Sequence, residues 1–150
     1  MTTDGIKEPL LLTIAVLGGT GKEGKGLAYR WAKAGYKVLI GSRSEERAVT
    51  AASEIMELAE GSTSIVGTSN HEAAQLADIV VLTVPFAAHR ETLESVKDVL
   101  KGKTLIDVTV PLVPPKVTKV QMPSAGSAAQ EAKEIVGEGV EVVAAFHSIS

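Results

Sequence analysis

Three glycines near the start of the chain have a spacing that suits phosphate binding. Gly19, Gly21 and Gly24 fit G-x-G-x-x-G, between an apolar, β-branched run over residues 12–17 and a helical pattern. Such glycines permit a tight turn, close approach of the backbone to a pyrophosphate, and close packing of helix on strand. The helix N-terminus adds free N–H groups and a partial positive charge. We predict a dinucleotide site here, with a merely structural turn as the alternative. The residues predicted to contact the dinucleotide are Gly19, Thr20, Gly21, Lys22, Glu23 and Gly24.

The end of the second predicted strand indicates which dinucleotide the site would hold. NAD enzymes carry an acidic residue there for the ribose hydroxyls, but this chain has Ser42 and Arg43, with Arg47 one turn into the next helix. A hydroxyl and a guanidinium suit a 2′-phosphate, and Thr20 can add a hydroxyl from the other side. The alternative is that Ser42 caps the second helix, with Glu45 completing a capping box, while Arg43 is solvated. The pattern favours NADP over NAD.

Other residues with reactive side chains form no compelling catalytic group. His71 lies in a capping box and is expected to be solvated. His89 falls in the first turns of the helix after Phe86, where it could reach the cleft. His147, at a strand end, either lines the pocket or makes a structural hydrogen bond. The histidine spacing gives no metal site. Asp107, at the end of the fifth strand, is expected to be a turn or cap residue rather than a base.

Composition excludes several classes of protein. The 150 residues include no cysteine, so disulfides, thiolate metal sites and a cysteine nucleophile are absent. The formal net charge is −3 with mixed signs and no basic stripe, which argues against nucleic-acid binding. No apolar run is as long as a membrane span. We expect a soluble, cytoplasmic protein with a loose lead-in over residues 1–10 and one domain over residues 11–150.

The order of predicted elements favours an α/β fold. Apolar runs alternate with helical patterns along the whole chain, which is typical of right-handed crossovers and a parallel sheet. We predict a doubly wound (Rossmann) sheet of about six strands in the order 3-2-1-4-5-6, with the cleft beyond strands one and four. The expected strands cover residues 12–17, 36–40, 63–66, 78–84, 104–108 and 140–145. After the helix that follows the glycines, the expected helices cover residues 44–58, 69–76, 86–100 and 125–136.

Motifs in this order resemble a known family. They are Leu-Gly-Gly-Thr-Gly-Lys-Glu-Gly-Lys-Gly-Leu-Ala at 17–28, Gly-Ser-Arg at 41–43, Leu-Thr-Val-Pro-Phe at 82–86 and Val-Pro-Leu-Val-Pro-Pro at 110–115. Residues 145–149 are similar to that family's Ala-Leu-His-Thr-Ile. The chain resembles the NADPH-dependent reductases of the deazaflavin coenzyme F-420 (F420). It is less similar to ferric reductases and pyrroline-carboxylate reductases.

The resemblance implies a phosphate pocket. Thr20, Ser42, Arg43 and Arg47 would surround the 2′-phosphate of NADP, and a lysine is usual in the family where Arg47 stands. Hydride would pass directly between NADP(H) and F420, so no catalytic side chain is predicted. The protein would supply stacking, orientation and exclusion of water.

The resemblance also implies a second part of the site. Thr83, Pro85 and Phe86 would line the cofactor at the end of the fourth strand, where the family often has tryptophan in place of Phe86. His147 and Ile149 would lie near the nicotinamide, where the deazaflavin ring stacks.

Length is the main departure from the family. Family members continue into a helical part that helps form the deazaflavin pocket and the dimer interface, and we expect this part to be absent from this chain. We expect a homodimer that transfers hydride between NADP(H) and F420, its small-molecule redox co-substrate, with activity impaired if the chain is truncated. One alternative is an NADPH reductase for another flavin or a small carbonyl. Another is a non-catalytic NADP(H)-sensing module.

Overall fold

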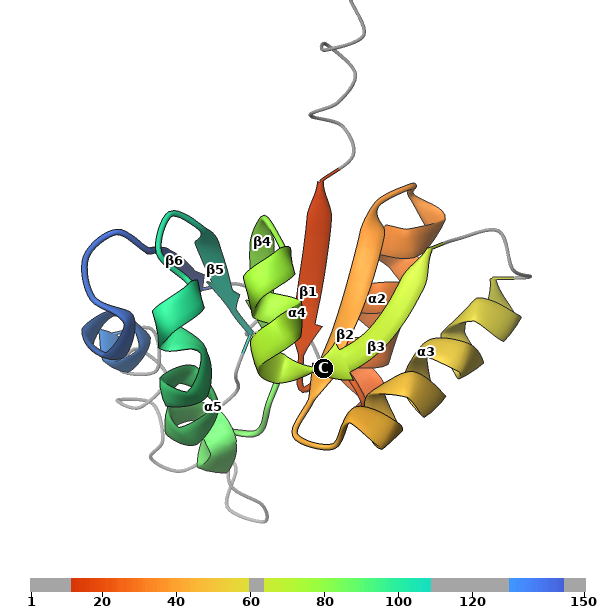
Figure 1. Ribbon diagram of the computed structural model, residues 1–150, viewed down its shortest axis with the longest axis horizontal. Coiled ribbons are helices and arrows are strands. Elements are labelled where there is room, and N and C mark those ends of the chain that lie inside the picture. Colours follow the sequence, from red (N-terminus) through yellow and green to blue (C-terminus); the bar gives the residue numbers. More distant parts are fainter. Residues whose placement is uncertain (1–11, 60–63, 109–129, 145–150) are drawn as a thin grey trace, which may run out of the picture.

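The computed structural model describes residues 12–59, 64–108 and 130–144, which form a parallel sheet with helices on both faces (Figure 1). The sheet has six strands in the order β3-β2-β1-β4-β5-β6. This confirms the predicted doubly wound topology, and β1 lies in the middle of the sheet between β2 and β4. The strands are β1 (Thr13–Leu17), β2 (Lys37–Ser42), β3 (Ile65–Ser69), β4 (Ile79–Leu82), β5 (Thr104–Asp107) and β6 (Glu141–Ala144).

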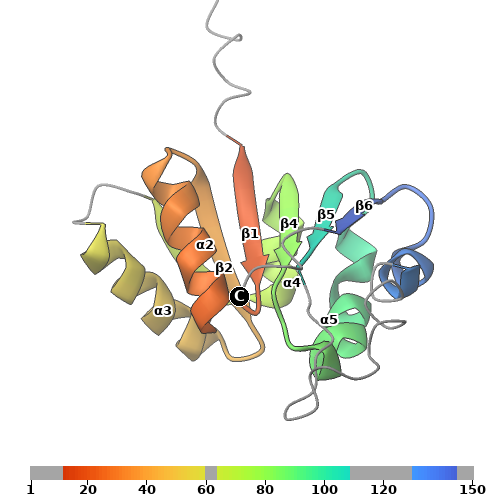
Figure 2. The same ribbon diagram turned by 180° about the vertical axis from the view of Figure 1, so that it is seen from behind.

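The helices cover the sheet in two groups. Helix α4 lies in front of the sheet in Figure 1, and α2 lies in front of it in the reverse view of Figure 2. Alternate residues of β1 enter the two cores: Ala15 and Leu17 pack with α4 and α5, whereas Ile14 and Val16 pack with α2 and α3. The helices are α2 (Lys22–Lys33), α3 (Glu45–Leu58), α4 (Asn70–Leu76) and α5 (His89–Val96), with the 3₁₀ turns η2 (Phe86–Ala88) and η3 (Lys97–Val99) and a helix that includes residues 130–136.

The third strand differs from its prediction. It begins two residues later than expected and continues through Gly67 to Ser69, which pairs with Ser42 of β2. A β-carbon on Gly67 would lie 2.2 Å from the carbonyl oxygen of Ala48, so α3 packs directly on the strand backbone at this point. The glycine is therefore a contact site inside the strand and does not end it.

The end of the fifth helix also differs from its prediction. Helix α5 ends at Val96, and the 3₁₀ turn η3 replaces the predicted last turn of helix. The predicted lead-in, the proline-rich motif at 110–115, and both His147 and Ile149 lie outside the described residues. Within the described ranges, no helix has both the length and the apolar character that a membrane crossing requires.

Candidate functional site

A cleft of about 630 Å³ opens at the carboxyl end of the sheet. Its walls come from the glycine turn after β1, the ends of β2 and β4, and the start of α5, so it lies where the doubly wound topology places a ligand. Gly19 is not among the lining residues, because it packs against Ile40 and Val16 of the sheet. The predicted contact residues that line the cleft are Thr20, Gly21, Lys22, Glu23, Gly24, Ser42, Arg43, Arg47, Thr83 and Pro85.

The roles of the individual glycines in the turn differ from those predicted. Gly18, which the sequence motif does not include, has a φ of +75° and makes the left-handed bend. A β-carbon on Gly24 would lie 2.8 Å from the Cα atom of Gly19, so α2 packs closely on the turn. On Gly21 the nearest atom to a β-carbon would be 3.9 Å away. The backbone at Gly21 therefore stays open to a ligand.

The N-terminus of α2 faces this opening. Its N-cap residue, Gly21, is extended and offers no side-chain hydrogen bond, whereas Ser44 caps α3 and Ser69 caps α4. The first N–H groups of a helix have no partner within the helix. In α2 they are available to an anion, and the helix dipole favours negative charge there.

Thr83 holds the turn from the neighbouring strand. Its hydroxyl donates to the carbonyl oxygen of Leu17 at 2.8 Å and also lies 3.2 Å from that of Gly18. Thr83 therefore lines the cleft as predicted, but its hydroxyl is engaged by the backbone. Its role in this structure is to fix β4 against the glycine turn.

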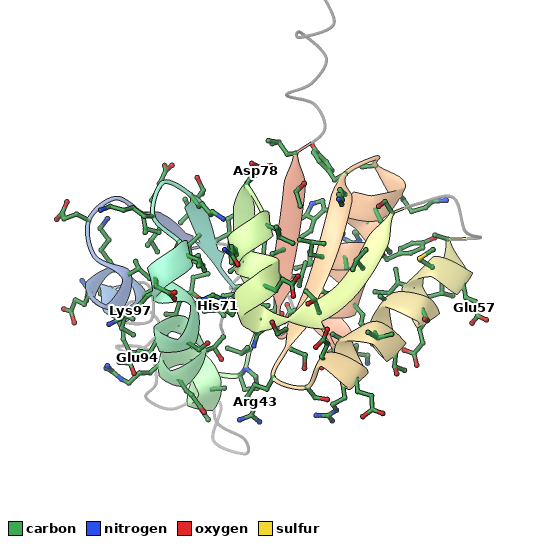
Figure 3. All side chains as sticks on the ribbon, viewed as in Figure 1. Arg43, Glu57, His71, Asp78, Glu94 and Lys97 are labelled. Atoms are coloured by element: carbon green, nitrogen blue, oxygen red, sulfur yellow. The ribbon has the colours of Figure 1, made fainter. Side chains whose placement is uncertain are left out.

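The tip of β2 carries hydroxyls and cations and no acidic side chain. The Oγ atom of Ser42 is buried and accepts from the N–H of Ser44 at 3.1 Å, and the Oγ atom of Ser44 accepts from the N–H of Arg47 at 3.3 Å. Ser44 is thus the N-cap of α3, so the alternative in which Ser42 caps this helix is wrong. Arg43 extends beyond the carboxyl end of the sheet, and its guanidinium lies 3.8 Å from Glu91 on α5 (Figure 3).

Asn70 is a lining residue that the sequence analysis missed. It is 93% buried, since its exposed fraction is 7%, and its Oδ1 atom has no hydrogen-bond partner within the described residues. A β-carbon on Gly41 would lie 2.7 Å from this oxygen, so a glycine in β2 makes room for the amide. The sequence places Asn70 inside a capping box, which hides its position beside the cleft. We call Ser42, Arg43, Arg47 and Asn70 the β2 side of the cleft.

The opposite wall is less polar. Besides Thr83 and Pro85 it includes Ala88, Thr92 and Val108, which the sequence analysis did not identify. We call these five residues the β4–β5 side of the cleft. Phe86 begins the η2 turn, but its side chain lies outside the described part of the structure.

Behind the β4–β5 side lies a buried ion pair. His89 and Asp107 are both fully buried, and the His89 Nε2 atom lies 2.8 Å from the Asp107 Oδ2 atom. The Nδ1 atom of His89 lies 3.2 Å from the Oε1 atom of Glu131. Burial alone lowers the pKa of His89, but the hydrogen bond to Asp107 and the charges of Asp107 and Glu131 outweigh it and raise the pKa. His89 does not line the cleft. Asp107, expected to be a turn or cap residue, ends β5, and its carboxylate also pairs with His89.

His71 also has a carboxylate partner. Its Nε2 atom lies 3.0 Å from the Oδ2 atom of Asp98, and its side chain is about half exposed. The hydrogen bond from His71 lowers the pKa of Asp98. This pair is accessible to solvent, in contrast to the buried pair of His89 and Asp107.

The fold and the cleft together define a dinucleotide-binding domain of the doubly wound class. A family model described as NADP oxidoreductase, coenzyme F420-dependent, matches residues 13–111. The chain belongs to this family, which confirms the resemblance drawn from the motifs.

Two relatives of the same name match most of this chain. The F420-dependent NADP reductase of Methanothermobacter marburgensis is 45% identical over 144 residues, covering 93% of this chain and 64% of the relative. The enzyme of the same name from Methanocaldococcus jannaschii is 37% identical, covering 92% of this chain and 64% of the relative. The chain therefore spans just under two thirds of the length of these relatives.

Solved structures share the fold. A crystal structure from Arthrobacter sp. FB24, provisionally assigned as an F420-dependent NADP reductase, superposes with a TM-score of 0.75 at 24% identity, covering 93% of this chain and 64% of that one. Pyrroline carboxylate reductase of Plasmodium falciparum with NADP bound gives a TM-score of 0.59 at 21% identity, covering 89% of this chain and 40% of that one. At these identities the similarity establishes the fold alone.

Proposed function

We propose that this chain binds NADP(H) in the cleft and serves as the nucleotide-binding part of a reductase that exchanges hydride with F420. The observation that carries the proposal is the tip of β2, where Ser42, Arg43 and Arg47 line the cleft and neither of the two residues at the strand end is acidic. A guanidinium can clamp a phosphate through paired, charge-assisted hydrogen bonds. The relatives named as F420-dependent NADP reductases support the same conclusion.

We infer one direction for the dinucleotide in the cleft. With the 2′-phosphate at Arg43 and Arg47, the pyrophosphate would lie over Gly21 and the uncapped N-terminus of α2. The nicotinamide half would then lie over the β4–β5 side of the cleft. The open space at Gly21 is the cradle that such an approach needs.

Bound NADPH would supply the hydride, and the residues of this chain would bind and orient it. The cations at the tip of β2 hold one end, the glycine turn holds the centre, and the apolar β4–β5 side excludes water from the other end. Catalysis in this proposal comes from alignment of the two cofactor rings.

The test is stopped-flow absorbance of the protein mixed with NADPH and oxidised F420, with NADH as the comparison. We expect loss of the deazaflavin absorbance with NADPH and little with NADH. Arg43→Gln should weaken NADPH binding by about 1.5–3 kcal/mol, since a hydrogen bond to a charged group is lost. Arg30→Gln, an exposed arginine in the last turn of α2, is the matched control.

Calorimetry with NADPH separates the possible failures. If the protein binds NADPH but transfers no hydride, two interpretations remain: a non-catalytic NADP(H)-sensing module, or a reductase that needs further residues. Equal affinity for NADPH and NADH, or no effect of Arg43→Gln, would overturn the assignment of the 2′-phosphate site.

We also propose that the protein acts as a cytoplasmic homodimer with a small-molecule redox co-substrate. Composition and charge support the location, and the family resemblance supports the dimer. Light scattering after size exclusion should give twice the mass of one chain. A single-chain mass across micromolar concentrations would contradict the dimer.

A further inference from the structure

A network of alternating charges lies behind the β4–β5 side of the cleft. Asp107 ends β5, His89 begins α5, and Glu131 lies on the helix that includes residues 130–136. His89 contacts both carboxylates, at 2.8 Å and 3.2 Å, and Arg90 donates to the second oxygen of Glu131. We call these four residues the charge network.

The geometry of the network favours the protonated form of His89. Each ring nitrogen of His89 faces a carboxylate oxygen, and both nitrogens can donate only when the ring is protonated. The His89 and Asp107 side chains are 1% and 0% exposed, so the two charges cannot turn to water. A buried charge without a partner is costly, whereas alternation of sign from Asp107 through His89 and Glu131 to Arg90 offsets that cost.

The network is joined by the backbone to the cleft wall. Ala88 precedes His89, and Thr92 lies three residues later on the same helix. A shift of the His89 ring would therefore move both residues. Val108 follows Asp107 directly. Ala88, Thr92 and Val108 all line the cleft, on its β4–β5 side. No member of the charge network lines the β2 side.

We propose that His89 is a positioning residue that sets the β4–β5 side of the cleft for the nicotinamide half of the dinucleotide. The proposal rests on the proposed function, because it needs NADPH to bind in this direction. His89 does not touch the ligand; it acts through Ala88, Thr92 and Val108.

The network should also make this side of the cleft sensitive to pH. The described ionisable groups that face His89 are Asp107 from β5 and Glu131 from the helix over 130–136, with Arg90 beyond Glu131. These carboxylates raise the pKa of His89 despite its burial. As the pH rises through that pKa, one of the two contacts loses its N–H donor and the wall loosens.

The test compares NADPH with 2′,5′-ADP, which carries the 2′-phosphate but no nicotinamide. In the 150-residue chain, His89→Gln should weaken NADPH binding by about tenfold, because a small misplacement of a wall is enough, and should leave 2′,5′-ADP binding within about twofold. The matched control is His71→Gln, because His71 is also paired with a carboxylate but is half exposed and does not line the cleft. It should change neither affinity.

Two further measurements can contradict the proposal. Glu131→Gln removes one carboxylate of the network and should give a smaller loss in the same direction, even if His89→Gln does not fold. In the unsubstituted chain, the ratio of NADPH to 2′,5′-ADP affinity should fall as the pH rises above 6.5, the ordinary pKa of histidine, and this fall should vanish in His89→Gln.

The outcomes separate this proposal from the proposed function. A chain that binds neither NADPH nor 2′,5′-ADP contradicts the proposed function itself. A chain that binds both, but loses them equally on substitution of His89, has a histidine with a general structural role, and the positioning proposal fails. The proposal also fails if His89→Gln and Glu131→Gln leave NADPH binding unchanged.

Discussion

The two sides of the cleft carry charge in opposite ways. On the β2 side the cations are exposed: the side chain of Arg43 is 74% exposed, and Arg47 also faces solvent. Behind the β4–β5 side, His89 and Asp107 are fully buried and paired. Exposed charges are screened by salt and adapt to a ligand, whereas buried pairs are screened much less and are fixed in place. If NADPH binds as proposed, the β2 side would recognise charge and the β4–β5 side would recognise shape.

Removing one buried partner should have the largest effect on stability. Asp107→Asn keeps the size of the side chain but leaves the buried imidazolium without one of its carboxylates. We expect the free energy of unfolding to fall by about 3 kcal/mol, the cost of breaking a buried pair. Urea unfolding at pH 7 measures it. Asp98→Asn, which removes the exposed partner of His71, is the control and should leave the urea midpoint unchanged. Equal effects of the two substitutions would contradict the contrast.

The same pair predicts how stability depends on pH. The pKa of His89 is raised in the folded protein above its ordinary value of 6.5, so the folded state holds this proton more tightly than the unfolded state. The stabilisation is fully present below about pH 6.5 and is lost as the pH rises through the folded pKa. Urea midpoints from pH 6 to 9 should therefore fall more steeply in the unsubstituted chain than in His89→Gln. Parallel curves would show that His89 does not titrate in this range.

The glycine turn, where the two sides meet, allows folding and binding to be separated. Gly24→Ala would place a methyl group 2.8 Å from the Gly19 backbone and should destabilise the fold by about 1–3 kcal/mol. Gly21→Ala has room in the protein and should leave the melting temperature unchanged. It should nevertheless weaken NADPH binding by about 1.5–3 kcal/mol, because a methyl group holds the pyrophosphate away from charged hydrogen bonds. Unchanged NADPH affinity in Gly21→Ala would remove the turn from the site.

The sequence predicts what depends on local pattern and misses what depends on distant contacts. The strand order and the uncapped glycine turn follow from periodicity and from a motif within six residues. The partners of His89 are 18 and 42 residues away, and no local signal joins them. Gly67 shows the same limit, because its role depends on α3 packing against the strand. Asn70 is hidden for a different reason, since its capping-box setting explains it locally.

The smallest expected effect concerns the contact that crosses between the two sides. Arg43 at the end of β2 lies 3.8 Å from Glu91 on α5, and both side chains are largely exposed, at 74% and 70%. An exposed ion pair at this distance contributes little, so Glu91→Gln should change the free energy of unfolding by less than about 0.5 kcal/mol.

Its effect on binding should nevertheless be measurable. If Arg43 binds the 2′-phosphate as proposed, Glu91 would compete with it and add a negative charge beside the cleft. Glu91→Gln should then raise NADPH affinity about twofold at low salt and not at high salt. Glu94→Gln, on the same helix and paired with Arg90, controls for the change in net charge. If both variants raise affinity equally, the gain comes from the overall field of the protein. If Glu91→Gln instead lowers affinity, Glu91 holds Arg43 in position for the phosphate, and the β2 side is then arranged in advance of binding.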